Sequence, residues 1–130
     1  MNESLQLSAT ERTPLVDWDP QTGRLHLEGE AYPEDAAAFF GPILESVSAA
    51  VESATSSKFH VSLAMIYFNS SSAKALMNLF QMLEHAASRG CDVLIEWIYR
   101  EDDLTMQEFG EDFSEDFEHA RFECVVRAAS

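Results

Sequence analysis

The chain has 130 residues, 46% of them hydrophobic, and its 8 basic against 23 acidic residues give a formal net charge of −15 at pH 7. This length and apolar content predict one globular domain with its own core. A charge this negative repels phosphate backbones and anionic lipid surfaces, so we expect neither nucleic-acid binding nor membrane binding. It favours a partner with a basic surface.

The sequence shows no sign of export or of a membrane anchor. No apolar run approaches the roughly 20 residues that span a bilayer. The N-terminal segment also lacks the basic start and apolar stretch of a secretion signal. We therefore expect a cytoplasmic protein whose single domain covers residues 1–130.

In chain order, the first elements read as a hairpin and a helix. Residues 1–13 are polar and are expected to be flexible. Residues 15–18 and 24–30 read as strands joined by a turn at residues 19–23, which predicts a β-hairpin. A helix opens at Tyr32-Pro33-Glu34-Asp35, with proline in its first turn. Its buried face is expected to comprise Phe40, Ile43, Leu44, Val47 and Val51.

The second half alternates strands and helices. Residues 59–68 are apolar at nearly every position, as in a central strand covered on both faces. A helix over 71–88 ends at Gly90, and a second apolar strand covers 93–99. An acidic helix over 104–117 precedes a last strand at 122–126. The expected inward stripe of the first of these helices is Ala73, Leu76, Phe80, Leu83 and Ala87, and the expected anchors of the acidic one are Leu104, Phe109, Phe113 and Phe117.

The resulting order, β-β-α-β-α-β-α-β, predicts an α/β domain with a mixed β-sheet and helices packed against it. The run Asn69-Ser70-Ser71-Ser72 lies where the apolar strand gives way to the helix. A helix N-terminus has free backbone N–H groups and partial positive charge, so it suits either a capping side chain or a phosphorylated serine. The spacing alone leaves both interpretations open, and one residue can cap while another is modified.

Two segments in combination suggest a family: Gly29-Glu30-Ala31-Tyr32-Pro33-Glu34, and Tyr67-Phe68-Asn69-Ser70-Ser71-Ser72-Ala73-Lys74. The order of elements resembles the STAS fold of anti-sigma-factor antagonists. More specifically, the sequence resembles the SiaC-type regulatory phosphoproteins of bacteria over residues 13–100. These are STAS-like modules in which a hydroxyl residue just after the asparagine is phosphorylated.

The resemblance implies a non-enzymatic, partner-switching regulatory phosphoprotein in bacterial signal transduction. A Ser/Thr protein kinase would phosphorylate Ser70, with Ser71 and Ser72 as the alternatives, and a metal-dependent, PP2C-like phosphatase would remove the group. The unmodified form would bind and activate a diguanylate cyclase, which raises cyclic di-GMP and favours biofilm formation. The family often has threonine at the acceptor position, where this chain has Ser70.

Further residues are candidates for partner binding. Asn69, Ser71 and Lys74 flank the acceptor, and Tyr32, Pro33 and Glu34 are expected at the same sheet edge. Each also has a structural interpretation: Asn69 as a loop-fixing side chain, Lys74 as a solvated lysine, and the Tyr-Pro-Glu segment as a helix start.

The sequence gives no support for catalysis, a metal or a cofactor. The four histidines show neither HxxxH nor HExxH spacing, and the five glycines form no phosphate-binding loop. Two other functions remain open. One is a small acidic scaffold or oligomerisation domain whose serines only cap a helix, and the other is a STAS-like antagonist of an anti-sigma factor.

Overall fold

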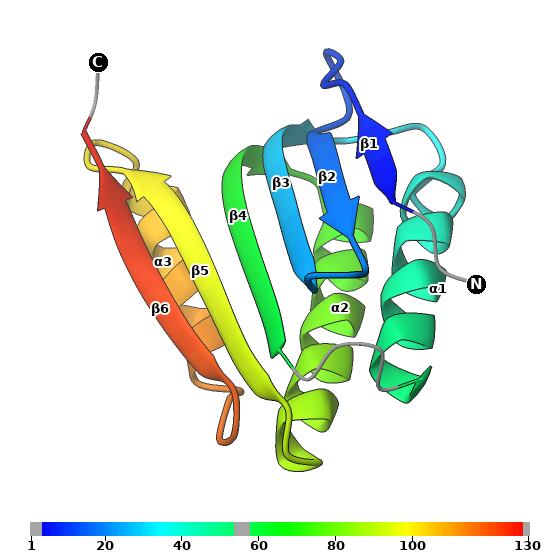
Figure 1. The fold of residues 1–130 in the computed structure, drawn as a ribbon. Helices are drawn as coiled ribbons and strands as arrows, with labels where there is room; N and C mark the ends of the chain where they lie inside the picture. The colour runs from blue at the N-terminus through cyan, green and yellow to red at the C-terminus, as the bar shows by residue number, and fades with distance from the viewer. Residues whose placement is uncertain (1–3, 54–57, 129–130) are drawn as a thin grey trace.

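The computed structural model describes residues 4–53 and 58–128. Figure 1 shows its sheet and helices. The elements are β1 (Leu5–Leu7), β2 (Leu15–Asp19), β3 (Arg24–Ala31), α1 (Ala36–Ser53), β4 (Lys58–Phe68), α2 (Ser70–Ser88), β5 (Asp92–Arg100), α3 (Leu104–Ser114) and β6 (Arg121–Arg127).

The six strands form one sheet in the order β1-β2-β3-β4-β5-β6. β1, β2 and β3 pair antiparallel, whereas β3 to β6 pair parallel through the crossover helices α1, α2 and α3. The expected mixed sheet and the order of the eight elements from Leu15 onward are confirmed. β1 is an addition, because Leu5–Leu7 pairs with β2 where the sequence suggested a flexible segment.

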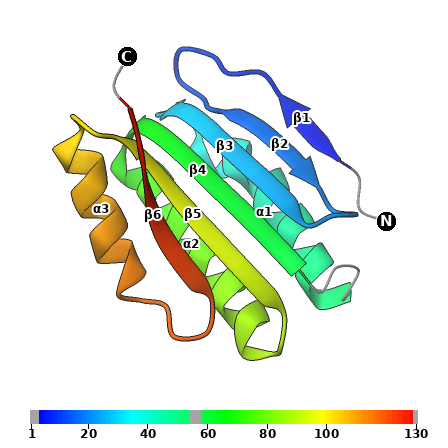
Figure 2. The same cartoon turned by 60° about the vertical axis from the view of Figure 1, so that its left-hand side comes forward.

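All three helices cover the same face of the sheet, as Figures 1 and 2 show. β4 is a central strand, but the expectation that it is covered on both faces is wrong. Phe59, Val61 and Leu63 are buried toward the helices, while the alternate residues His60 and Ser62 are half-buried on the open face. This two-layer arrangement leaves one side of the sheet without a helical cover.

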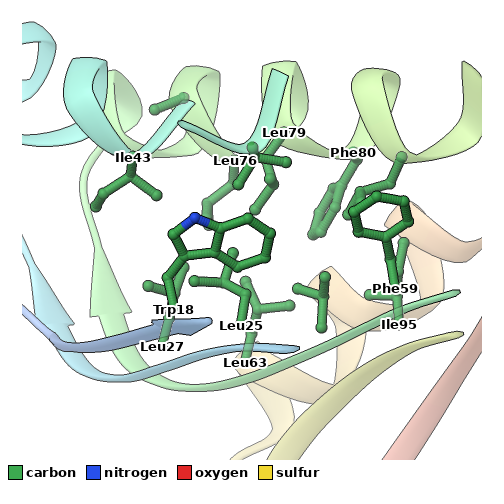
Figure 3. Packing of buried hydrophobic residues seen from close by; sticks show 14 of the residues in the cluster. Trp18, Leu25, Leu27, Ile43, Phe59, Leu63, Leu76, Leu79, Phe80 and Ile95 are labelled. Carbon is green, nitrogen blue, oxygen red and sulfur yellow. The ribbon is translucent and has the colours of Figure 1, made fainter. Parts of the chain in front are cut away.

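The core lies between the sheet and the helices. Figure 3 shows Leu25, Leu27 and Leu63 from the strands meeting Leu76 and Leu79 of α2. Two tryptophans are fully buried, and each indole N–H has an acceptor. Trp18 donates to the Ser46 hydroxyl at 2.7 Å, and Trp97 donates to the Met106 carbonyl at 2.8 Å. The tryptophans thus tie the sheet to α1 and α3, as buried indoles require a partner.

The first helix starts later than predicted and is not interrupted. α1 begins at Ala36, and the Asp35 carboxylate accepts from the Ala38 N–H at 3.0 Å, so Asp35 caps the helix and Pro33 precedes it. The helix continues through Pro42. Gly41 lacks the Cβ that would crowd the ring of a following proline, which explains why helical geometry is tolerated there.

The anchors of the acidic helix were predicted only in part. Leu104 is 67% exposed, so it is not an anchor, and Phe109 is 37% exposed. Met106 is buried instead, while Phe113 packs edge-on against Phe80 and Trp97. α3 also ends at Ser114, three residues earlier than expected. Within the described ranges, no helix is both long and apolar enough to cross a membrane.

Candidate functional site

The junction of β4 and α2 is built around a capping asparagine. Asn69 is extended, with φ −86° and ψ 177°, and its side chain accepts from the Ser72 N–H at 2.9 Å. Its backbone carbonyl accepts from the Ala73 N–H at 2.8 Å. Asn69 therefore has the loop-fixing role that the sequence left open, and α2 begins directly at Ser70.

The three serines have different environments. Ser70 and Ser71 are exposed in the first turn of α2, whereas Ser72 is fully buried. The Ser72 hydroxyl is out of reach of another protein's active site in the folded chain. Two of the three predicted hydroxyls therefore lie where a kinase can approach them.

Ser70 and Ser71 lie about 100° apart around the axis of α2. Ser71 lines a hollow between α1 and α2 together with Lys74 and Asn78, which follow it by three and seven residues. Ser70 lies seven residues before Met77, so these two differ by only about 20° around the helix axis. Met77 lines a separate hollow on the α3 side of α2. Ser71 thus faces the hollow between α1 and α2, whereas Ser70 lines neither hollow.

The local field at this helix end favours an anion. In the part of the chain that the structure describes, no hydrogen bond is made by the Ser70 and Ser71 backbone N–H groups. α2 is 19 residues long, and its N-terminus carries the partial positive charge of the aligned peptides. Lys74 is exposed one turn further on. A phosphate on Ser70 would meet free N–H donors and a nearby ammonium group.

The segment before α1 lies against this junction, as the sequence predicts. The Asn69 N–H donates to the Ala31 carbonyl at 3.1 Å. The rings of Tyr32 and Tyr67 pack edge-on with centroids 5.8 Å apart. Glu34 lines the same hollow of about 560 Å³ as Ser71 and Lys74. Pro33 is half-buried between Tyr32 and Glu34, so the predicted partner-binding residues form one surface.

Three features near the junction of β4 and α2 were not predicted from the sequence. Arg12 pairs with Glu34 at 2.9 Å, which fixes the segment after β1 to the start of α1. Asp35 caps α1. A β-bulge shifts the register of β3 and β4, so that Gly29 faces Met65 but Glu30 faces Tyr67.

The bulge decides which side chains reach the surface beside Ser70. The extra residue, Ile66, is 60% exposed, and Tyr67 is 48% exposed, while Phe68 turns into the core against Phe109 with ring centroids 4.8 Å apart. Strict alternation along β4 would have buried Tyr67 instead. The end of β4, just before Ser70, thus carries large exposed apolar side chains.

Other ionisable side chains pair with one another away from this junction. On the open face of the sheet, His26 bonds to the Ser62 hydroxyl at 2.6 Å and to the Glu28 carboxylate at 2.8 Å. The hydrogen bond from His26, aided by Arg127, holds the pKa of Glu28 below its ordinary value despite partial burial. The described residues contain no group of three side chains suited to a metal ion.

Comparison with known proteins identifies the family. The sequence profile of the SiaC family of regulatory phosphoproteins matches residues 7–127. An uncharacterized protein of Pseudomonas aeruginosa strain UCBPP-PA14 is 32% identical over 112 residues, which is 86% of this chain and 88% of the relative.

Solved structures agree with the sequence match. Apo-SiaC from Pseudomonas aeruginosa superposes with a TM-score of 0.82 at 29% identity, over 97% of this chain and 99% of that one. SiaC in complex with the diguanylate cyclase SiaD, of which it is the activator, gives a TM-score of 0.85 at 31% identity, over 96% and 99% of the two chains. The chain therefore belongs to the SiaC family of regulatory phosphoproteins.

Proposed function

We propose that this chain is a partner-switching regulator whose Ser70 hydroxyl is reversibly phosphorylated and whose unmodified form binds and activates a diguanylate cyclase. The observation that carries the proposal is the placement of Ser70. It is exposed at the first position of a long helix, directly after the capping Asn69. The Pseudomonas aeruginosa relative that activates SiaD supports a cyclase as the target.

The chemistry at Ser70 is supplied by other proteins. A Ser/Thr protein kinase transfers a phosphoryl group to the hydroxyl, and a PP2C-like, metal-dependent phosphatase hydrolyses the ester. The chain itself contributes the acceptor and its position, and acts in the cytoplasm as a non-enzymatic binding partner. Its output is the level of cyclic di-GMP, and through it biofilm formation.

Phosphorylation acts on the interface through charge, size and hydration. The phosphate adds about −1.5 to −2 charges at pH 7. Ser70 follows Ile66 and Tyr67, two exposed apolar side chains at the end of β4 that favour contact with a partner. A large hydrated group there prevents close packing, and a loss of about 2.7 kcal/mol weakens binding about a hundredfold.

The phosphorylation step is tested with the cognate kinase on the unsubstituted protein and two variants. We expect an 80 Da increment on the unsubstituted protein, mapped by peptide mass spectrometry to Ser70. Ser70→Ala should abolish it, and Ser71→Ala, the neighbouring exposed serine, should retain it. Labelling of Ser71 in place of Ser70 would show that Ser71 is the acceptor. No labelling of any serine would favour an acidic scaffold whose serines only begin a helix.

A further inference from the structure

The candidate site continues into a groove along the outer side of α1 and α2. We propose that this α1–α2 groove binds a basic amphipathic helix of the target protein. The identity of the target rests on the proposed function. The shape and the charge of the groove come from the two helices themselves.

Two neighbouring hollows form the α1–α2 groove. The first, of about 560 Å³, starts at Ser71 and Lys74 beside the phosphorylation site. The second, of about 750 Å³, reaches Glu52 near the end of α1. They share Leu44 and Asn78, so they are continuous. Along α1, the lining from Ala36 to Glu52 corresponds to roughly 24 Å at 1.5 Å per residue.

Small and aliphatic side chains line much of the groove. On α1, Ala37, Gly41, Leu44 and Ala49 contribute to it. A Cβ added to Gly41 would meet no atom within 4 Å, so the groove is open at this point. A groove between two packed helices accepts the apolar stripe of a third helix, with anchors spaced by three or four residues.

The acidic side chains along the groove favour a basic partner. Glu45 and Glu52 are exposed on its α1 side and make no ion pair within the described ranges. Lys74 is the one lysine or arginine among the residues described as lining it. A second copy of this chain, at −15, would be repelled. A helix with lysine or arginine beside its apolar stripe is complementary.

The hollow on the other side of α2 shares Gln81 and His85 with the groove but fits this role less well. It is lined by Met77, Phe113 and Phe117 but does not include any residue of the serine triplet. Its glutamate, Glu84, already accepts hydrogen bonds from three backbone N–H groups between α3 and β6. The α1–α2 groove includes Ser71, the residue next to the proposed acceptor.

The first test reverses charge on the full-length chain and measures affinity for its cognate diguanylate cyclase. We expect Glu45→Lys/Glu52→Lys to weaken binding at least tenfold at low salt, with a smaller effect as salt is raised. The matched control is Glu115→Lys/Glu123→Lys, two exposed glutamates outside the groove. Equal effects of the two double variants would overturn the groove assignment.

The second test uses a photo-crosslinking residue at two adjacent positions of α2 that line different hollows. Placed at Asn78, which both hollows of the groove share, it should capture a basic helical segment of the cyclase. Placed at Met77, it should not. Capture from Met77 alone would overturn the groove and leave the cyclase as target. If the unsubstituted chain does not bind the cyclase, the proposed function is overturned. A helix of the cyclase is then also excluded as the occupant of the groove.

Discussion

The Asn69 side chain accepts a hydrogen bond from the Ser72 N–H at 2.9 Å, and this contact closes the first turn of α2. The cap is thus made by the residue before the serines. Ser70 is left at the first helical position with its side chain exposed. The structure assigns the cap to Asn69, so the proposed phosphorylation of Ser70 does not compete with it.

Loss of this cap should be measurable as a loss of stability. Asn69→Ala is expected to lower the free energy of unfolding by about 1 kcal/mol, because the Ser72 N–H loses its acceptor. Asn69→Ser keeps a capping oxygen and should lose much less. Urea unfolding followed by circular dichroism compares the three proteins. Equal losses in the two variants would show that the cap itself contributes little.

Ser72 offers the opposite prediction. Its hydroxyl is buried, and no hydrogen-bond partner for it is found in the described part of the chain. Ser72→Ala removes a buried polar group and should raise the free energy of unfolding by about 1 kcal/mol. Ser70→Ala, on the exposed side of the same turn, should change it by less than about 0.5 kcal/mol. A destabilised Ser72→Ala protein would mean that the hydroxyl is satisfied.

Gly110 tests whether packing outweighs helix propensity. Propensity alone predicts that Gly110→Ala stabilises α3 by about 1 kcal/mol. A Cβ at this position would lie 2.5 Å from Cδ1 of Trp97, a fully buried side chain. We therefore expect a loss of about 1–3 kcal/mol from overpacking. Thermal unfolding decides the sign, with Glu111→Ala as the exposed neighbouring control. A stabilised Gly110→Ala protein would contradict the close approach of α3 to β5.

Glu84 should make stability depend on pH. Partial burial alone would raise its pKa, but hydrogen bonds from the Ala120, Glu118 and His119 N–H groups outweigh this and lower it from the ordinary value. A lowered folded-state pKa means that the carboxylate stabilises the fold above its unfolded pKa, and that this contribution disappears as pH falls through the folded pKa.

The matching experiment compares Glu84→Gln with the unsubstituted protein across pH. At pH 7 the variant is expected to be less stable by about 1 kcal/mol, because the amide keeps one acceptor oxygen and its NH2 group cannot accept from the remaining N–H groups. The difference should shrink as pH is lowered below the ordinary range of a glutamate. A difference that is constant with pH would show that Glu84 acts through packing and not through its charge.

Much of the fold can be predicted from the sequence because local signals agree with it. The turn at residues 19–23 and the start of α2 are found close to where their residues suggest. Gly90, with φ 106°, follows the last turn of α2, as a helix-ending glycine should. What the sequence does not reveal is set by distant partners. β1 is recognisable only once β2 is beside it.

The same distinction applies to the candidate site. The serine run and the Tyr-Pro-Glu segment are visible as local patterns. The burial of Ser72 and the exposure of Ser70 and Ser71 depend on where α2 packs. The bulge at Ile66 breaks the alternation of β4 and exposes Tyr67. A strand pattern read with a strict period of two cannot predict such a shift.

The most direct test of the switch is the affinity of the chain for its cognate diguanylate cyclase before and after stoichiometric phosphorylation of Ser70. We predict that the unmodified protein binds the cyclase and that the phosphorylated protein binds it with an affinity about a hundredfold lower. The Ser70→Ala variant should bind like the unmodified protein, with or without prior incubation with the kinase. An affinity that does not change on phosphorylation of Ser70 would contradict the account.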